Sequence, residues 1–439
     1  MQPASMHEKP SILAPRVTNP RSHVPPIGKL PTPQLIPAPL WLCAEMAWSL
    51  HRDRGWYLPF GIMNTPLPFL VFVLLCGVAS GQQYLLLSAT KDKPLASYKI
   101  KGTRGELSLY DQVSLPGNGG PMAVSEDERF FYVESRVKME GEKKEKPYLL
   151  TYALSGGEIR KVGQVEAKYR TCSMDVDVGG TRLLCAHYGE GAITSWEIGK
   201  DRALTGKMVQ EIETAPRAHF VTTDPTGRYV YVPHTSPNAV YQFNLGYDGQ
   251  ITPLDPPFAK GPDTENRYHE PRHLVHHPAL HCVYTSNERG GGISMWKHNH
   301  RTGQLRLRQT LSTLPEGYPE KGGAAADVHI TPNGKFVYVS NRDYSKRGKE
   351  GTPQSTIAGF RANEHSGRLE PIGIFPTEHA PRSFCIDKTG RFMYVAGQHT
   401  NKLAAYVIDD QTGELTLVQT YNTPEAPIWV TVVNNHIEK

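Results

Sequence analysis

Asp224-Pro-Thr-Gly-Arg-Tyr-Val-Tyr-Val232 is the segment that decides the fold, because its pattern returns twice more along the chain. The later copies are Thr331-Pro-Asn-Gly-Lys-Phe-Val-Tyr-Val339 and Asp387-Lys-Thr-Gly-Arg-Phe-Met-Tyr-Val395. Each copy is a turn that ends in glycine and a basic residue, followed by the aromatic and β-branched residues that are typical of a strand. The repeat therefore predicts a series of similar hairpins.

Weaker copies carry Arg129, Arg182 and His281 at the basic turn position, and consecutive copies lie roughly fifty residues apart. A period of this length is typical of a four-stranded propeller blade. The segment 82–439 has room for seven such blades, and the remaining blade must join 84–87 to 429–433. The predicted fold is all-β, a seven-bladed β-propeller with four-stranded blades whose ring is closed by the N- and C-terminal strands.

The first 81 residues differ from the propeller segment in composition. Residues 1–62 are rich in proline and show no strand or helix period, so we interpret them as a disordered or spurious N-terminal extension. Residues 63–81 contain the apolar run 69–78 followed by small residues, which is typical of a signal peptide and too short for a stable membrane span. We expect the domain 82–439 to be exported to the periplasm or the extracellular space. An apolar linker in a cytoplasmic protein is the alternative.

Charge and cysteine content narrow the class of protein. The net charge is only +5, and the one basic run, 138–146, is interpreted as a solvated loop, so no nucleic-acid partner is expected. After leader removal Cys172, Cys185, Cys282 and Cys385 would remain, which is too few for a disulfide framework. We expect buried free thiols, with a bridge between Cys172 and Cys185 as the alternative.

Positions that differ between the repeats are better candidates for function than those that agree. Residues nine before and seven after the basic turn residue should lie opposite each other, at the end of the hairpin away from the turn. They are therefore expected to surround one mouth of the central channel. Besides Ser173 and Thr235, the polar members of this ring are His219, Arg272, Arg382, Arg136, Glu288, Arg342 and Gln398.

This ring suits the binding of an anion, because guanidinium groups hold carboxylate or phosphate with two hydrogen bonds. His219 and Glu288 are suited to general acid and base roles. Two structural interpretations stay open: the arginines that follow proline pin loops between blades, and His219 and Glu288 form a satisfied hydrogen-bonded pair.

Several segments carry a resemblance to a known family. They are Pro271-Arg-His-Leu274 with Ser286-Asn-Glu288, Ala325-Ala-Asp-Val-His-Ile-Thr-Pro332 with Asn341-Arg342, Ala380-Pro-Arg-Ser-Phe384 with Ala396-Gly-Gln398, and Pro427-Ile-Trp-Val430. With them the chain resembles the lactonase family of seven-bladed propellers, which includes propeller-type 6-phosphogluconolactonases and carboxy-muconate cyclases. Before His219 the chain departs from the family, since it reads Ala215-Pro-Arg-Ala218 where a Pro-His-Ala-His type of sequence is common.

The resemblance implies roles for individual residues. His219, Arg272, Glu288 and Arg342 fall on positions proposed to act in the muconate-cyclase branch, so they are the expected catalytic residues. The expected substrate-binding residues are Arg136, Asp327, His329, Arg382 and Gln398.

The leading hypothesis is hydrolysis of an anionic sugar lactone, 6-phosphogluconolactonase-like. Glu288, with His219 as alternative or partner, would activate water, while Arg272 and Arg342 would bind the substrate anion and the developing oxyanion. A small-molecule lactone or carboxylate is the expected partner, with no cofactor and no metal.

Three other functions stay open. One is a muconate-type lactonising cyclase that uses the same groups, and another is a non-enzymatic exported propeller binding module. A six-bladed, metal-dependent gluconolactonase is the third, although its metal would need carboxylate ligands where this ring is basic.

Overall fold

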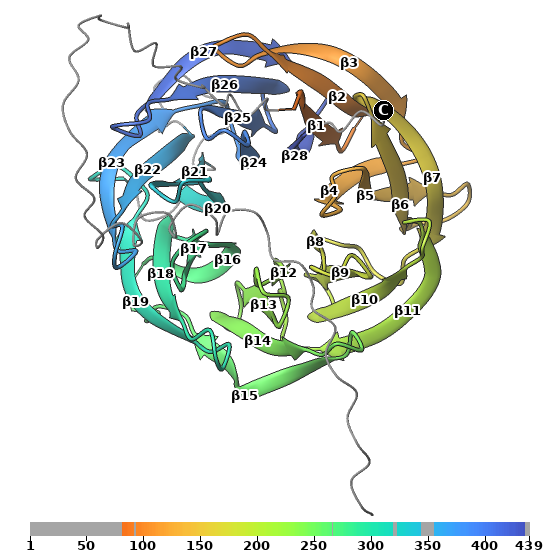
Figure 1. Ribbon diagram of the computed structural model, residues 1–439, viewed down its shortest axis with the longest axis horizontal. Coiled ribbons are helices and arrows are strands. Elements are labelled where there is room, and N and C mark those ends of the chain that lie inside the picture. Colours follow the sequence, from red (N-terminus) through yellow and green to blue (C-terminus); the bar gives the residue numbers. More distant parts are fainter. Residues whose placement is uncertain (1–80, 92–93, 266, 319–322, 344–354, 435–439) are drawn as a thin grey trace, which may run out of the picture. The chain divides into compact units, whose positions relative to one another are not determined.

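A computed structural model describes residues 81–91, 94–265, 267–318, 323–343 and 355–434. Within these ranges the chain forms 28 β-strands and no helix, arranged as seven four-stranded blades around a common axis (Figure 1). The predicted seven-bladed propeller is confirmed, and the six-bladed alternative is wrong. The N-terminal extension predicted for residues 1–62 lies outside the described residues, as does the signal peptide predicted for residues 63–81 apart from its last residue, Gly81.

Blade 1 is built from both ends of the chain, and the next three blades follow in sequence order. From the axis outward, blade 1 contains β28 (Pro427–Asn434), β1 (Gln83–Ala89), β2 (Pro94–Lys101) and β3 (Glu106–Ser114), and blade 2 contains β4 (Asn118–Val124), β5 (Phe130–Lys138), β6 (Glu145–Ser155) and β7 (Glu158–Glu166). Blade 3 contains β8 (Ser173–Val176), β9 (Arg182–His187), β10 (Ala192–Ile198) and β11 (Leu204–Glu213). Blade 4 contains β12 (Thr222–Thr223), β13 (Tyr229–His234), β14 (Ala239–Leu245) and β15 (Ile251–Lys260).

Blades 5 to 7 complete the ring. Blade 5 contains β16 (His269–His276), β17 (Cys282–Arg289), β18 (Gly292–His298) and β19 (Leu305–Ser312). Blade 6 contains β20 (Gly323–Ile330), β21 (Phe336–Asp343), β22 (Thr356–Ala362) and β23 (Leu369–Pro376). Blade 7 contains β24 (Pro381–Ile386), β25 (Phe392–Gly397), β26 (Lys402–Ile408) and β27 (Leu415–Asn422). Blades 5 and 6 are also bridged, because Arg289 of β17 pairs with Ala324 of β20.

Ring closure rests on the antiparallel pairing of β1 with β28. Their register runs from Gln83 opposite Asn434 to Ser88 opposite Trp429. Leu85, Leu86 and Leu87 of β1 are fully buried, so the pairing is covered on both faces of the sheet. The predicted closure by the N- and C-terminal strands is therefore confirmed, and β1 leaves no free edge at that position.

The tyrosine three residues after the basic turn residue holds neighbouring blades together. Tyr231, Tyr284 and Tyr338 are fully buried, and each hydroxyl donates to a glycine carbonyl in the outer turn of the next blade, at 2.5 to 2.7 Å. These acceptors are Gly303, Gly367 and Gly413, which have φ values of 72, 72 and 79°. The repeated tyrosine and the repeated turn glycine are thus two halves of one contact between blades.

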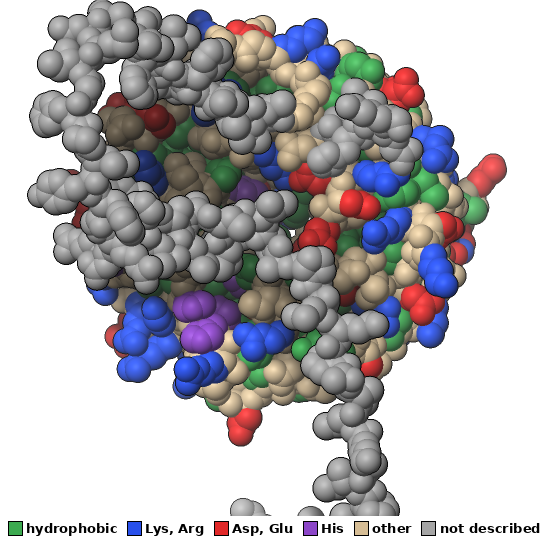
Figure 2. All heavy atoms as spheres, in the orientation of Figure 1, with side chains coloured by type: hydrophobic (Ala, Val, Ile, Leu, Met, Phe, Trp, Pro, Cys, Tyr) green, Lys and Arg blue, Asp and Glu red, His purple; other side chains and the backbone are tan. Residues whose placement is uncertain are grey.

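Apolar side chains fill the spaces between blades, as in the cluster of Leu86, Phe131, Val133 and Tyr152 between blades 1 and 2. The four described cysteines are free thiols, as expected, and the bridge between Cys172 and Cys185 is absent. On the face drawn in Figure 2, basic and acidic side chains are interspersed along the rim. Among the described residues no helix is long and apolar enough to cross a membrane.

Candidate active site

β-Bulges on the innermost strands position the mouth residues. Between β16 and β17 the register passes from Pro271 opposite Asn287 to Leu274 opposite Thr285, which leaves Arg272 and His273 within an irregular step. Similar shifts occur next to Gly120, Ala326 and Arg382. The expected symmetric pairing was therefore wrong, because an inserted residue displaces the register and turns the side chain of the bulged residue.

Backbone conformation before the bulges is strained in four blades. Arg217, Glu270, Ala380 and Ala426 have φ values of 66, 69, 56 and 58°. Left-handed conformations of non-glycine residues cost of the order of 1 kcal/mol or more and concentrate at functional sites. Three of these residues stand two positions before His219, Arg272 and Arg382, so the strain marks the same mouth as the side chains.

Glu288 lies between two of the predicted arginines. Arg342 Nη2 donates to Glu288 Oε1 over 2.6 Å, and Arg272 Nε stands 3.8 Å from the same oxygen. Burial alone would raise the pKa of Glu288, but the charges of Arg272 and Arg342 outweigh it and hold the pKa below its usual range. Glu288 is therefore a carboxylate at neutral pH.

The two arginines lie behind Glu288. Arg272 is 0% exposed and Arg342 is 3% exposed. Their guanidinium groups also donate to backbone carbonyls: Arg272 Nη1 to Ala326 O at 2.7 Å and Arg342 Nη2 to Ala325 O at 3.2 Å. Arg272 and Arg342 thus hold the Glu288 carboxylate and the bulge of blade 6, and neither is among the described residues that line the adjacent pocket.

His219 is a buried, uncharged imidazole next to that pocket. Its Nδ1 has no hydrogen-bond partner among the described residues, and its ring packs edge-on against Tyr188 with centroids 5.4 Å apart. Burial, and then the charge of Arg272, lower the pKa of His219 well below the usual value. Cys172 Sγ donates to His219 O at 3.2 Å, and burial raises the pKa of this thiol to about 12, so it positions the backbone as a neutral donor.

His219 and Glu288 line one pocket of about 420 Å³, together with Arg170, Tyr188 and Arg382. An adjoining pocket of about 300 Å³ shares Arg170 and Arg382 and extends toward blade 2. The structure thus brings His219, Glu288 and Arg382 to one cavity. Among the described residues, no group of three or more His, Cys, Asp or Glu side chains is arranged to hold a metal ion.

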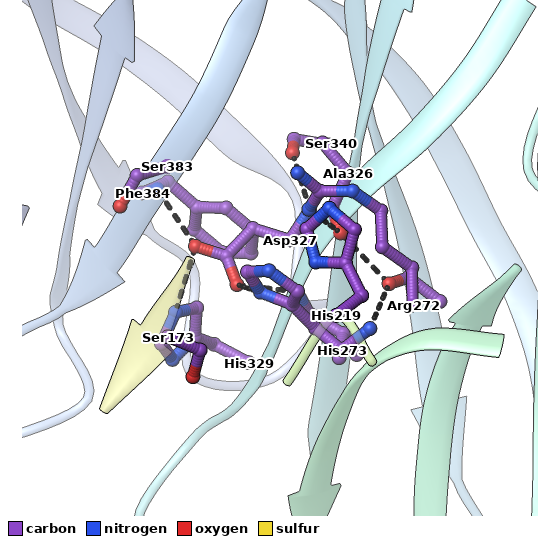
Figure 3. A network of polar contacts seen from close by, with 12 residues as sticks. Ser173, His219, Arg272, His273, Ala326, Asp327, His329, Ser340, Ser383 and Phe384 are labelled. Atoms are coloured by element: carbon purple, nitrogen blue, oxygen red, sulfur yellow. Dashed lines mark hydrogen bonds and ion pairs between the residues drawn. The ribbon is translucent and has the colours of Figure 1, made fainter. Parts of the chain in front are cut away.

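Asp327 lies at the junction of three blades (Figure 3). Its carboxylate accepts hydrogen bonds from His273 Nδ1 of blade 5 at 2.8 Å and from Phe384 N of blade 7 at 3.2 Å, while His329 Nε2 lies 3.3 Å away. Burial opposes ionisation, but His329 and His273 hold the pKa of Asp327 well below its usual range. Asp327 therefore organises the junction, and neither it nor His329 lines the two pockets in the described part of the chain.

The remaining predicted residues lie in the adjoining pocket. Arg136, Arg382 and Gln398 all line it. Sequence reasoning missed Glu134, Arg170 and Tyr188. Glu134 had a detectable signal, because it is the only charged residue five positions after a basic turn residue, but Arg170 and Tyr188 lie outside the positions that were compared.

Comparison with known proteins agrees with this architecture. The family model described as lactonase, 7-bladed beta-propeller, matches residues 84–432. A 6-phosphogluconolactonase of Pectobacterium carotovorum is 28% identical over 353 residues, which is 80% of this chain and 99% of the relative. The 6-phosphogluconolactonase of Serratia proteamaculans is 28% identical over 330 residues, covering 75% of this chain and 92% of the relative.

Among solved structures, the periplasmic gluconolactonase PpgL of Pseudomonas aeruginosa superposes with a TM-score of 0.69 at 21% identity, over 80% of this chain and 99% of that chain. A protein from Lactobacillus plantarum gives a TM-score of 0.68 at 22% identity, over 80% of this chain and 99% of that chain. These structures share the fold. Because the family model covers all seven blades, the chain belongs to the lactonase family of seven-bladed β-propellers.

Proposed function

We propose that the protein hydrolyses an anionic sugar lactone in the pocket lined by His219 and Glu288. The observation that carries this proposal is that one cavity holds an uncharged imidazole, a carboxylate and the guanidinium of Arg382. The named relatives are 6-phosphogluconolactonases, and this chain matches them over most of their length. They support lactone hydrolysis as the reaction. Lactone hydrolysis needs a base for water and a cation for the developing oxyanion.

His219 is the better candidate for the general base. The carboxylate of Glu288 is bound by Arg342, whereas the imidazole of His219 is uncharged and lines the pocket. The imidazole would take a proton from water as the water oxygen bonds to the lactone carbonyl carbon. The imidazolium would then return that proton to the ring oxygen as the acyl–oxygen bond breaks, which leaves a hydroxy acid.

The charged groups around His219 are proposed to act electrostatically on the reaction. Arg382 lines the pocket and is positioned to stabilise the oxyanion, a role that the sequence had suggested for Arg272 and Arg342. Those two buried arginines keep Glu288 ionised, which leaves a carboxylate in the same pocket as His219.

A substrate screen tests this proposal. The purified protein should hydrolyse 6-phosphogluconolactone or an unphosphorylated sugar lactone, measured as acid release at constant pH and corrected for spontaneous opening. The screen includes muconates: turnover of muconates alone would assign the site to a lactonising cyclase. Binding of the same compounds without turnover would assign the protein to the binding modules.

We also propose that the domain is exported. The support is the apolar run 69–78 with the small residues that follow it. Determining the N-terminus of the mature protein tests this, because cleavage near Gln82 is expected and an intact leader would contradict it.

A further inference from the structure

Blade 2 carries a second carboxylate and guanidinium pair at the mouth. Glu134 and Arg136 stand two residues apart on β5, which lies across the ring axis from β17 and β21 (Figure 1). Glu134 is 2% exposed and Arg136 is 8% exposed. Arg136 Nε stands 3.4 Å from Glu134 Oε2 but makes no hydrogen bond in the described part of the chain, so a buried donor is left unsatisfied.

In two other blades the residue at the position of Glu134 accepts a hydrogen bond from a backbone N–H of the bulge. Blade 2 has no such N–H at this place. The equivalent Ser286 and Ser340 accept the backbone N–H groups of the bulged residues His273 and Asp327 at 3.2 and 3.0 Å. In blade 2 the corresponding bulge residue is Pro121, which has no N–H to satisfy. Glu134 accepts only the N–H of Thr171, at 2.8 Å, among its described contacts.

Space for a ligand adjoins this pair. Glu134 and Arg136 line the pocket of about 300 Å³, with Arg170 and Arg382 on the side shared with His219. Gly120 makes room for the carboxylate, because a Cβ at this residue would lie 2.2 Å from Glu134 Oε2. Because the two pockets share Arg170 and Arg382, a substrate held at His219 could place its far end next to Arg136.

The charges around Glu134 are few. Burial raises the pKa of Glu134 to about 7, although the charges of Arg136 and Arg170 and the N–H of Thr171 oppose the shift. Glu145 of β6 is a carboxylate that raises this pKa further. The Cys172 and Cys185 thiols, whose own pKa values are raised by burial, also interact with Glu134. Burial thus brings the titration of Glu134, which lies next to Arg136, close to neutral pH.

We propose that Arg136 and Arg170 form a second anion subsite, which receives a phosphate or carboxylate at the end of the substrate away from the lactone carbonyl, and that Glu134 takes up a proton when this anion binds. The inference rests on the proposed function for the identity of the substrate. The incoming anion replaces the Glu134 carboxylate as the partner of Arg136, and protonation removes the repulsion between the two negative groups.

Proton uptake gives a measurable pH dependence. Above the pKa of Glu134 the anion binds together with one proton, so affinity falls as the pH rises. Relative to Glu134→Gln, which stays neutral, the affinity of the wild type should fall roughly tenfold between pH 6 and pH 8. The titration of the ligand's own phosphate affects both proteins equally and cancels in this comparison.

The test is calorimetric titration of the protein with 6-phosphogluconate, with gluconate as the matched ligand that lacks phosphate. Titrations in buffers of different ionisation enthalpy count the protons taken up. At pH 8 the wild type should take up close to one proton with 6-phosphogluconate beyond the count for Glu134→Gln, and gluconate should show no such excess. Arg136→Met should weaken 6-phosphogluconate at least tenfold and gluconate little.

Glu145→Gln is the matched control, because it removes the other carboxylate near Arg136, at 3.8 Å, from a more exposed position. This variant should keep the proton uptake. An equal proton count in the wild type and Glu134→Gln overturns the proposal, as does failure of 6-phosphogluconate to bind. If Glu134→Gln does not fold, the excess count of 6-phosphogluconate over gluconate on the wild type at pH 8 decides, because the free phosphate ester is already a dianion there and takes up no proton at a cationic site.

Lactone hydrolysis is measured separately from these titrations. Proton-linked binding without hydrolysis would leave the subsite standing and remove the proposed function. Hydrolysis without proton-linked binding would do the reverse.

Discussion

Arg342 Nη2 donates to Glu288 Oε1 over 2.6 Å, and this bond joins β21 of blade 6 to β17 of blade 5. Arg342→Met keeps much of the side-chain length but removes that bond. Catalytic efficiency should fall about thirty- to a hundredfold, which corresponds to the loss of about 2 to 3 kcal/mol of charge-assisted contact. Steady-state kinetics on an anionic lactone gives the activity, and denaturant unfolding should show a stability loss of about 1 to 3 kcal/mol because the arginine is buried.

Arg391→Met is the matched control for this change. Arg391 is exposed at the opposite end of a hairpin, where it stacks over the Phe392 ring at 5.2 Å. Its removal should alter stability by only about 0.5 kcal/mol and leave activity unchanged. If Arg342→Met leaves hydrolysis intact, or unfolds the protein outright, Arg342 is a residue of blade packing.

His219→Gln removes the proposed base while keeping a polar side chain of similar size. The turnover number should fall about a hundred- to ten-thousandfold, with a small change in the thermal midpoint. Because the pKa of His219 is well below the usual imidazole value, wild-type activity on an uncharged lactone should stay level from pH 8 down to about pH 6.5. A rate that halves near pH 7 on that substrate would contradict the assignment.

Glu134 should make stability depend on pH. Its folded pKa of about 7 lies above that of an unfolded glutamate, so the neutral form is favoured by folding and stability is lost as the pH rises through 7. Relative to Glu134→Gln, the wild type should lose up to about 3 kcal/mol of unfolding free energy between pH 4 and pH 8. Urea unfolding at both pH values measures this, and parallel losses in the two proteins would show that Glu134 does not titrate in this range.

Gly120→Ala tests the space that Glu134 occupies. The added methyl would meet the Glu134 carboxylate at 2.2 Å, so we expect a stability loss of about 1 to 3 kcal/mol and weaker binding of 6-phosphogluconate. Gly189→Ala is the control, since a Cβ there meets nothing within 4 Å and the residue also lies at the mouth. Equal effects of the two substitutions would show that the mouth tolerates or rejects a methyl group regardless of Glu134.

A chain that begins at Gln82 should fold, because β1 supplies the strand that pairs with β28. Deleting residues 82–97 should instead leave β28 with an open edge and cause aggregation. Size-exclusion chromatography and circular dichroism of both chains check this. An insoluble chain from Gln82 beside a soluble full-length protein would show that the preceding residues take part in folding.

The repeat was enough to predict the blades, because the turn glycine and the tyrosine make the same contact in successive blades. The mouth was harder to predict. Counting symmetrically from the turn selected Arg272 and Glu288, but it could not show that a bulge places Arg272 behind the carboxylate. The left-handed residues Glu270 and Ala380 carry no sequence signal, because glycine is absent where the backbone would favour it.

The pairing of Gln83 with Asn434 sets the order of events during synthesis. Strand β1 leaves the ribosome before every other described strand, whereas its partner β28 follows all of them. Until then β1 and β2 form an incomplete blade, and the most non-local contact of the molecule must form last. Until β28 emerges, one edge of β1 has no partner strand, so the growing chain exposes the edge of an apolar strand while all the other blades are made.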